Sequence, residues 1–130
     1  MCDNHSHSHS HAQNISIGEQ IMSANDMLAA HNRSHLDQDH VLGINVMASP
    51  GAGKTSLILR TIEALRPEHM LGVVEGDTAP VTLDADKIIT AGMPAVQVNT
   101  GGQCHLDAVM LANALHQLPL EDLDLMIVEN

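Results

Sequence analysis

The stretch VLGINVMASPGAGKTSLILR, which runs from Val41 to Arg60, decides the fold class. Its first eight residues form an apolar run of strand length, which is typical of a buried parallel strand. A loop with Gly and Pro follows at residues 49–53. Residues 54–65 then carry apolar side chains at helical spacing, and Pro67 follows two residues after them to end the helix. The stretch therefore predicts a strand, a tight loop and a helix in immediate succession.

The same alternation of strands and helices continues on the carboxyl side of this stretch. We predict further strands at residues 70–74, 94–99 and 123–128, and helices at 78–91 and 104–117, with Thr78 as an N-cap and Gly92 as a C′ residue. Strands that alternate with helices favour an α/β fold, in which a parallel sheet is flanked by helices. Ligands of such sheets bind at the carboxyl ends of the strands. The sequence stops at Asn130, just after a predicted strand, so we expect the fold to be incomplete at this end.

The loop between the first strand and its helix matches a phosphate-binding P-loop. Ala48-Ser-Pro-Gly-Ala-Gly-Lys54-Thr55 fits G-x-x-x-x-G-K-[ST] apart from Ala at the first position, where a small residue should fit. Glycines let backbone N–H groups point at an anion, the lysine reaches the β- and γ-phosphates, and the threonine hydroxyl holds Mg²⁺. The predicted nucleotide-binding residues are Ser49, Gly51, Ala52, Gly53, Lys54, Thr55 and Ser56. The alternative is a chance Gly-rich turn.

Acidic residues follow two of the predicted strands. Asp77 comes after the strand that ends near Val74, and Glu129 follows Val128. Carboxylates are ligands that Mg²⁺ prefers, and both strand ends should lie beside the P-loop. We therefore predict that Asp77 binds Mg²⁺ directly or through water, and that Glu129 does the same or orients the attacking water. The alternative is that these acids only cap strand ends in solvent.

Two further features are typical of transition-metal binding. Cys104 and His105 are adjacent at a predicted strand-to-helix junction, and thiolate with imidazole suits Zn²⁺ or Ni²⁺. Two ligands do not complete a site, so a second subunit or a further residue must contribute. The bland alternative is a small capping residue beside a surface histidine. The amino-terminal head carries Cys2, His5, His7, His9 and His11, which predicts a disordered tract that stores metal, or else a tag or an inert solubilising segment.

These features divide the chain into three parts. Residues 1–16 are predicted to be the disordered His-rich head, and residues 17–40 a helix, to about residue 32, with a polar connector that holds His31, His35 and His40. Residues 41–130 form the predicted nucleotide-binding domain. The chain has 130 residues, which is the length of one domain.

Composition excludes several classes of partner. The chain has 16 acidic and 5 basic residues, a net charge of −11, and no Phe, Tyr or Trp. Binding to nucleic acid or to an anionic membrane requires clustered Lys and Arg, so neither is expected. Two distant cysteines do not form a disulfide framework, and no apolar run reaches the ~20 residues of a membrane span. We expect a soluble, cytoplasmic protein.

Several segments together resemble one known family. NVMASPGAGKTSLI, VVEGD, GMPAVQVNTGGQCHLDA and LPLEDLDLMIVEN are similar to the HypB nickel-incorporation proteins, over about residues 17–130. The resemblance implies a GTPase of the CobW/HypB/UreG group, with GTP, Mg²⁺ and Ni²⁺ as ligands and Zn²⁺ as a second metal for the same site. It implies a homodimer dependent on nucleotide or metal, which passes nickel to the large subunit of [NiFe]-hydrogenase with a HypA-type nickel chaperone as partner.

Carried over residue by residue, the resemblance assigns the phosphates to Gly51, Gly53, Lys54 and Thr55. It places Asp77 and Glu129 at the nucleotide and Mg²⁺ switch positions, so that Lys54, Asp77 and Glu129 are the predicted catalytic residues. Cys104 and His105 fall at the metal site. Two family features are absent: a further cysteine soon after the position of Glu129, and the guanine-reading N-K-x-D motif. GTP is therefore implied by resemblance alone.

Three other functions compete with this hypothesis. A UreG-like GTPase for urease nickel belongs to the same class, although QVNTGGQCHLDA favours HypB. A nickel storage and binding protein without catalysis belongs to a different class, and the expected early end of the chain favours this alternative. A small-molecule kinase would require an Arg-rich lid, which the sequence does not contain.

Overall fold

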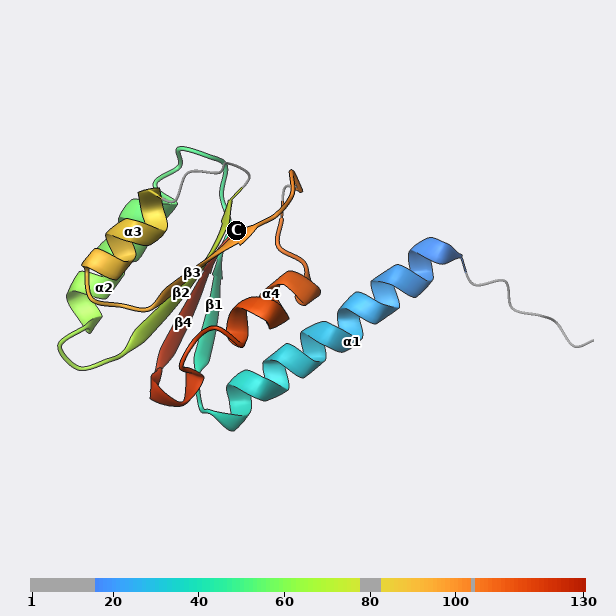
Figure 1. Cartoon of the computed structure of the whole chain (residues 1–130), viewed down its shortest axis with the longest axis horizontal. Helices are drawn as coiled ribbons and strands as arrows, with labels where there is room; N and C mark the ends of the chain where they lie inside the picture. Colours follow the sequence, from blue (N-terminus) through green and yellow to red (C-terminus); the bar gives the residue numbers. More distant parts are fainter. Residues whose placement is uncertain (1–15, 78–82, 104) are drawn as a thin grey trace, which may run out of the picture.

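The computed structural model describes residues 16–77, 83–103 and 105–130. Helices and strands alternate along the chain (Figure 1). The elements, in order, are α1 (Ile17–Gln38), β1 (Leu42–Val46), α2 (Lys54–Leu65), β2 (Leu71–Asp77), α3 (Leu83–Thr90), β3 (Ala95–Asn99), α4 (Ala108–Leu115), the short 3₁₀ helix η1 (Leu120–Asp122) and β4 (Leu125–Glu129). The expectations for the head, including Cys2, His5, His7, His9 and His11, lie outside the described residues, as do Thr78 and Cys104.

The four strands form one parallel sheet in the order β1-β4-β2-β3. This confirms the predicted α/β class. The last strand in sequence, β4, lies between β1 and β2, so that Glu129 is in register with Val46 on one side and Glu75 on the other. The carboxyl ends of β1, β4 and β2 therefore meet at one edge of the sheet, next to the predicted phosphate loop.

Each face of the sheet has its own apolar core. On one face, side chains of β2 and β4 such as Val73 and Ile127 pack against Ile58 and Ile62 of α2 and against Ile88 of α3. On the other face, the alternate strand residues pack with α4 and the end of α1; this core contains Val74, Met126, Val128, Ala114 and Leu115. Figure 1 shows α2 and α3 on one side of the sheet and α4 with α1 on the other. Because side chains point alternately to the two faces of a strand, successive residues of β2 and β4 belong to different cores.

The prediction that the first strand is buried is wrong. Strand β1 is present and parallel, but it forms an edge of the sheet and most of its residues are exposed. Leu42 is 63% exposed and Ile44 is 43% exposed. The reason is the strand order, because β4 is inserted between β1 and β2 and the cores are centred on β2 and β4.

Helix α1 extends beyond the predicted end at about residue 32 to Gln38, and therefore includes His35, which the sequence predicted to lie in a connector. It begins with a capping box, in which the Ser16 hydroxyl accepts the Glu19 backbone N–H and the Glu19 carboxylate accepts the Ser16 N–H. The segment after residue 32 has no Gly or Pro to end the helix. Leu36 extends the apolar contact to the core of the α4 face.

The end of α3 and the start of α4 compare differently with the sequence prediction. Helix α3 ends as predicted with Gly92 at C′, where φ is 88° and the Gly92 and Met93 N–H groups donate back to Ile89 and Ile88. Helix α4 begins at Ala108 with Asp107 as its N-cap, so the predicted start at residue 104 is wrong. Among the described residues, no helix has the length and the apolar composition needed to span a membrane.

Candidate nucleotide-binding site

The loop between β1 and α2 has the backbone of an anion-binding turn. Gly51 and Gly53 have φ values of 78° and 98°, in the left-handed region that side chains disfavour. No atom lies within 4 Å of an ideal Cβ at either position, so the glycines are needed for conformation and not for space. Gly53 is the N-cap of α2 and makes no side-chain capping bond. The positive end of α2 is therefore open toward an anion.

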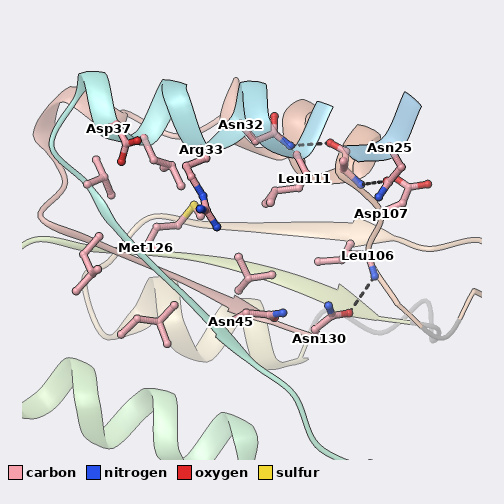
Figure 2. Close-up of a pocket in the computed structure, with 18 residues that line it drawn as sticks. Asn25, Asn32, Arg33, Asp37, Asn45, Leu106, Asp107, Leu111, Met126 and Asn130 are labelled. Atoms are coloured by element: carbon pink, nitrogen blue, oxygen red, sulfur yellow. Dashed lines mark hydrogen bonds between the residues drawn. The ribbon is translucent and has the colours of Figure 1, made fainter. Parts of the chain in front are cut away.

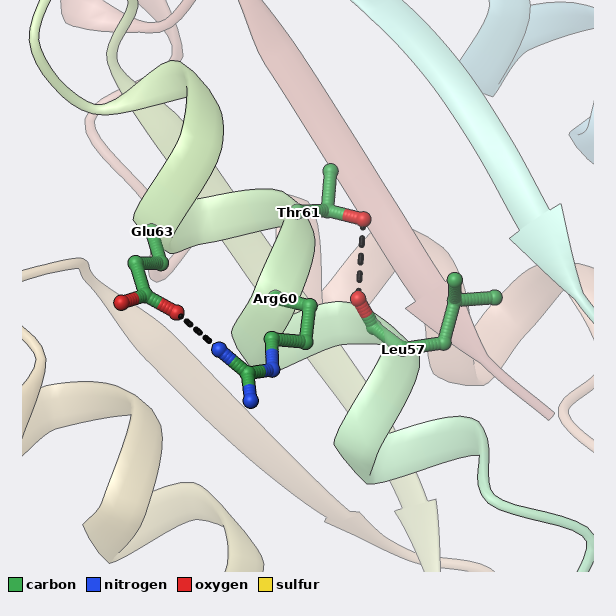
Figure 3. Close-up of polar contacts among 4 residues, drawn as sticks. All are labelled: Leu57, Arg60, Thr61 and Glu63. Atoms are coloured by element: carbon green, nitrogen blue, oxygen red, sulfur yellow. Dashed lines mark hydrogen bonds and ion pairs between the residues drawn. The ribbon is translucent and has the colours of Figure 1, made fainter.

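Lys54 lies across this loop. Its Nζ donates to the carbonyl oxygen of Ala48 at 2.7 Å, which joins the first and the seventh residue of the P-loop motif. Among the described residues that line the adjoining cleft, Lys54 is the only Lys or Arg. The nearby Arg60 does not line it and instead pairs with Glu63 at 2.9 Å on the exposed side of α2 (Figure 3). Phosphate charge at the loop would thus meet a single cationic side chain and the backbone amides.

The carboxyl ends of β4 and β2 bring two buried acids to the loop. Glu129 is 7% exposed, and its Oε1 accepts the Thr55 hydroxyl at 3.3 Å. Its Oε2 is buried without a hydrogen-bond partner. Glu75, 4% exposed, is the register partner of Glu129. The structure thus places Glu129 beside Thr55, where a cation or a phosphate-bound water would meet a buried carboxylate oxygen.

Glu75 is the site residue that sequence reasoning missed. The sequence favoured Asp77 from the same Glu-Gly-Asp string, and Asp77 is the last residue of β2, in register with Asn99. The signal for Glu75 was available in the alternation of β2. Glu75 follows Val73 by two residues, and therefore shares the face on which α2 and the P-loop lie.

A cleft of about 960 Å³ joins these groups. That volume lies in the range of ligand-binding pockets, about 300–1,000 Å³. The residues that line the cleft are Met47, Ala48, Ser49, Pro50, Gly51, Gly53, Lys54, Thr55, Ser56, Glu75, Gly76, His105, Glu129 and Asn130. All the predicted nucleotide-binding residues are included except Ala52, whose N–H donates to the Ser49 carbonyl.

His105 also lines the cleft, and its side chain is exposed. It lies three residues before α4, so the helix start does not support the predicted position of the pair at a helix N-terminus. Within residues 16–77, 83–103 and 105–130, no three His, Cys, Asp or Glu side chains form a group that could hold a metal ion. The structure therefore brings His105 to the phosphate cleft but does not complete a metal site from described residues.

The next residue, Leu106, is fixed from two sides. Its N–H donates to the side-chain oxygen of Asn130 at 2.9 Å. Its Cγ lies 2.8 Å from the position that a Cβ on Gly76 would occupy, so the side chain packs directly on β2. Helix α4 is held in turn by α1, because Asn25 accepts the Ala108 N–H and buried Asn32 donates to the Ala108 carbonyl. The segment between His105 and α4 is thus anchored to both the sheet and α1.

Comparison with known proteins agrees with this geometry. A family model described as the CobW/HypB/UreG nucleotide-binding domain matches residues 42–130, which include the P-loop, Glu75, His105 and Glu129. The chain belongs to the CobW/HypB/UreG family. Within this family it is 47% identical over 112 residues to the hydrogenase maturation factor HypB of Cupriavidus necator, a match that covers 84% of this chain and 31% of that protein.

Solved structures of HypB share the fold. The crystal structure of HypB from Helicobacter pylori in complex with nickel has a TM-score of 0.74 and 34% identity, and the match covers 82% of this chain and 50% of that one. HypB from Archaeoglobus fulgidus gives a TM-score of 0.74 at 36% identity, with 83% and 52% covered. The chain thus spans about half of these HypB chains and about a third of the Cupriavidus protein.

Proposed function

We propose that this chain is the nucleotide-binding part of a GTP-hydrolysing metallochaperone, which binds nickel and assists its insertion into [NiFe]-hydrogenase. The observation that carries the proposal is that one cleft contains a P-loop, a buried acid bonded to the P-loop threonine, and His105. The names of the relatives, hydrogenase maturation factors, and the nickel complex of a HypB structure support it. A HypA-type chaperone and the hydrogenase large subunit are the proposed partners.

Nucleotide binding would begin at the loop. The left-handed glycines turn the backbone so that amides face the phosphates, and the open end of α2 adds its dipole. Lys54 would exchange its bond to the Ala48 carbonyl for the β- and γ-phosphate oxygens. Because a carbonyl carries only a partial charge and a phosphate carries a full one, this exchange favours the bound state.

The residues present fit Mg²⁺. Thr55 and Glu129 supply hard oxygens, and the buried Glu129 Oε2 has no hydrogen-bond partner, as expected of an atom that faces a cation or its water. We propose Asp77, at the end of β2, as a further acidic ligand. When bound, Mg²⁺ neutralises charge on the transferred phosphoryl group. Lys54 would add its own positive charge at the phosphates, and Glu129 would hold Mg²⁺ or orient the attacking water.

Nickel is the proposed cargo, with Cys104 and His105 as its ligands and Zn²⁺ as a competitor. These two residues leave the metal's coordination incomplete. A nucleotide- or metal-dependent dimer would supply the same pair again across a two-fold axis. His105 lines the cleft, which supports a metal site close enough to respond to the nucleotide.

The proposal is tested by phosphate release from GTP and from ATP, with Mg²⁺, together with nucleotide and Ni²⁺ binding. Lys54→Ala should abolish nucleotide binding and release. The matched control is Lys87→Ala, which removes the only other lysine, exposed on α3, and should leave both unchanged. Ni²⁺ binding should survive in both variants. A wild-type chain that binds Ni²⁺ but neither nucleotide would contradict the proposal and favour a nickel store.

A further inference from the structure

We infer that Asn130 is a positioning residue that couples the nucleotide cleft to the segment of His105 and Leu106. This inference rests on the proposed function, since it concerns how nucleotide and metal influence each other. The supporting observation is at the end of β4, where two adjacent residues contact two different parts of the site. Glu129 contacts Thr55 of the P-loop, and Asn130 contacts Leu106.

The backbone of Asn130 is itself fixed to the nucleotide side. Its N–H donates to the Val46 carbonyl at 2.9 Å, and Val46 is the last residue of β1, two residues before the first residue of the P-loop. Its side-chain oxygen accepts the Leu106 N–H at 2.9 Å (Figure 2). One residue therefore joins the strand that leads into the phosphate loop to the residue that follows His105.

Strand β2 repeats this arrangement. Glu75 lies in register with Glu129 on the face of the P-loop, and the next residue, Gly76, receives the Leu106 side chain on the opposite face. Leu106 thus forms a hydrogen bond with Asn130 and packs on Gly76, and each of these two residues directly follows a buried glutamate. A shift of the strand ends as Glu129 engages a cation or water would be passed directly to Leu106 and to His105 beside it.

The chain is bonded to its surroundings on both sides of His105 and Leu106. Beyond Leu106, Ala108 is held through both backbone groups by Asn25 and Asn32. Before His105, the turn that contains Gly101 is closed by the Gly101 N–H, which donates to Asn99 Oδ1 at 2.9 Å, and by the Gln103 N–H, which donates to the Thr100 carbonyl at 3.2 Å. Between these two anchored ends, Asn130 is the residue that joins Leu106 to the strand leading into the P-loop.

The test uses NMR on the full chain. The Leu106 amide exchange rate and the His105 ring signals are measured with and without GDP and Mg²⁺, in the wild type, Asn130→Ala, Asn130→Asp and the control Asn113→Ala, an exposed position on α4. Loss of one hydrogen bond of typical net strength should speed Leu106 exchange by roughly tenfold in Asn130→Ala. Aspartate keeps an acceptor oxygen and should restore protection.

The decisive comparison is the response to nucleotide. In the wild type, Asn130→Asp and the control, GDP should shift both the Leu106 and His105 signals. In Asn130→Ala, measured at a GDP concentration that saturates that variant, these shifts should disappear. Unchanged Leu106 exchange or persistent His105 shifts in that variant would overturn the inference. A wild type that binds GDP without either shift would overturn it but leave the proposed function intact, whereas failure to bind any nucleotide would overturn both.

Discussion

The contact between Leu106 and Gly76 allows a quantitative test, through the substitution Gly76→Ala. An alanine Cβ would lie 2.8 Å from Leu106 Cγ and 3.1 Å from its Cδ1, closer than carbon atoms tolerate. Strand β2 cannot move easily, because it is paired on both sides. Overpacking typically costs about 1–3 kcal/mol. Since Leu106 is half-buried in a loop and can yield in part, we expect the free energy of unfolding to fall by about 1–2 kcal/mol, a factor of roughly 5–30 in the folding equilibrium.

The assay is urea unfolding followed by far-UV circular dichroism, because the chain has no Trp or Tyr for fluorescence. The same substitution is repeated in a Leu106→Ala background, which removes the two Leu106 atoms and leaves the Glu129 backbone oxygen at 3.3 Å from the alanine Cβ. There, Gly76→Ala should cost less than about 0.5 kcal/mol, since the greater stability of alanine in a strand offsets the remaining tight contact. Gly18→Ala is the control, with only Ser16 Oγ within 4 Å, at 3.9 Å. An equal loss of stability in both backgrounds would refute the contact with Leu106 as the cause.

Three further substitutions have expected outcomes. Gly72→Ala should lower the free energy of unfolding more than Gly76→Ala does, by about 2–3 kcal/mol in the same urea assay. The reason is that its Cβ would lie 2.6 Å from the buried Leu123 Cδ1. Gly53→Ala should cost about 1–2 kcal/mol from its φ of 98° and should weaken binding of a fluorescent guanine nucleotide; unchanged affinity would contradict the loop assignment. The Ser16 backbone N–H, and then its hydroxyl, lower the pKa of Glu19, so its stabilisation of α1 should be full above the ordinary value of 4.5 and be lost as pH falls through the lowered pKa. Amide NMR shifts in the first turn should follow that loss in the wild type and not in Glu19→Gln.

The sequence was sufficient where the determining interactions are local. The P-loop and α2 were predicted with correct bounds, because glycines at left-handed positions and an apolar helical stripe are encoded within about twenty residues. The end of α3 at Gly92 was predicted for the same reason. Glu129 was placed correctly beside Thr55 because parallel strands bring their carboxyl ends to one edge.

The sequence was insufficient where the structure depends on strand order or on contacts between residues far apart in the chain. An apolar run cannot show whether a strand is central or at an edge, so the exposure of Leu42 was not foreseen. The start of α4 depends on Asp107 as N-cap and on Asn25, which is 83 residues away from its partner Ala108. Helix propensity around residue 104 contains no information about that anchor.

The alternation of strand residues explains why the dipeptides Glu75-Gly76 and Glu129-Asn130 have their particular order. The first residue of each must face the P-loop, where a carboxylate is useful, and the second must face Leu106, where only a small residue or a hydrogen-bond acceptor fits. A slip of β4 by one residue would exchange the two roles, with an amide toward the phosphates and a carboxylate against the α4 layer. The apolar residues before each dipeptide prevent such a slip, because Val74 and Val128 belong to one core while Val73 and Ile127 belong to the other. The packing of the two cores therefore sets the register on which both the nucleotide contact and the Leu106 contact depend.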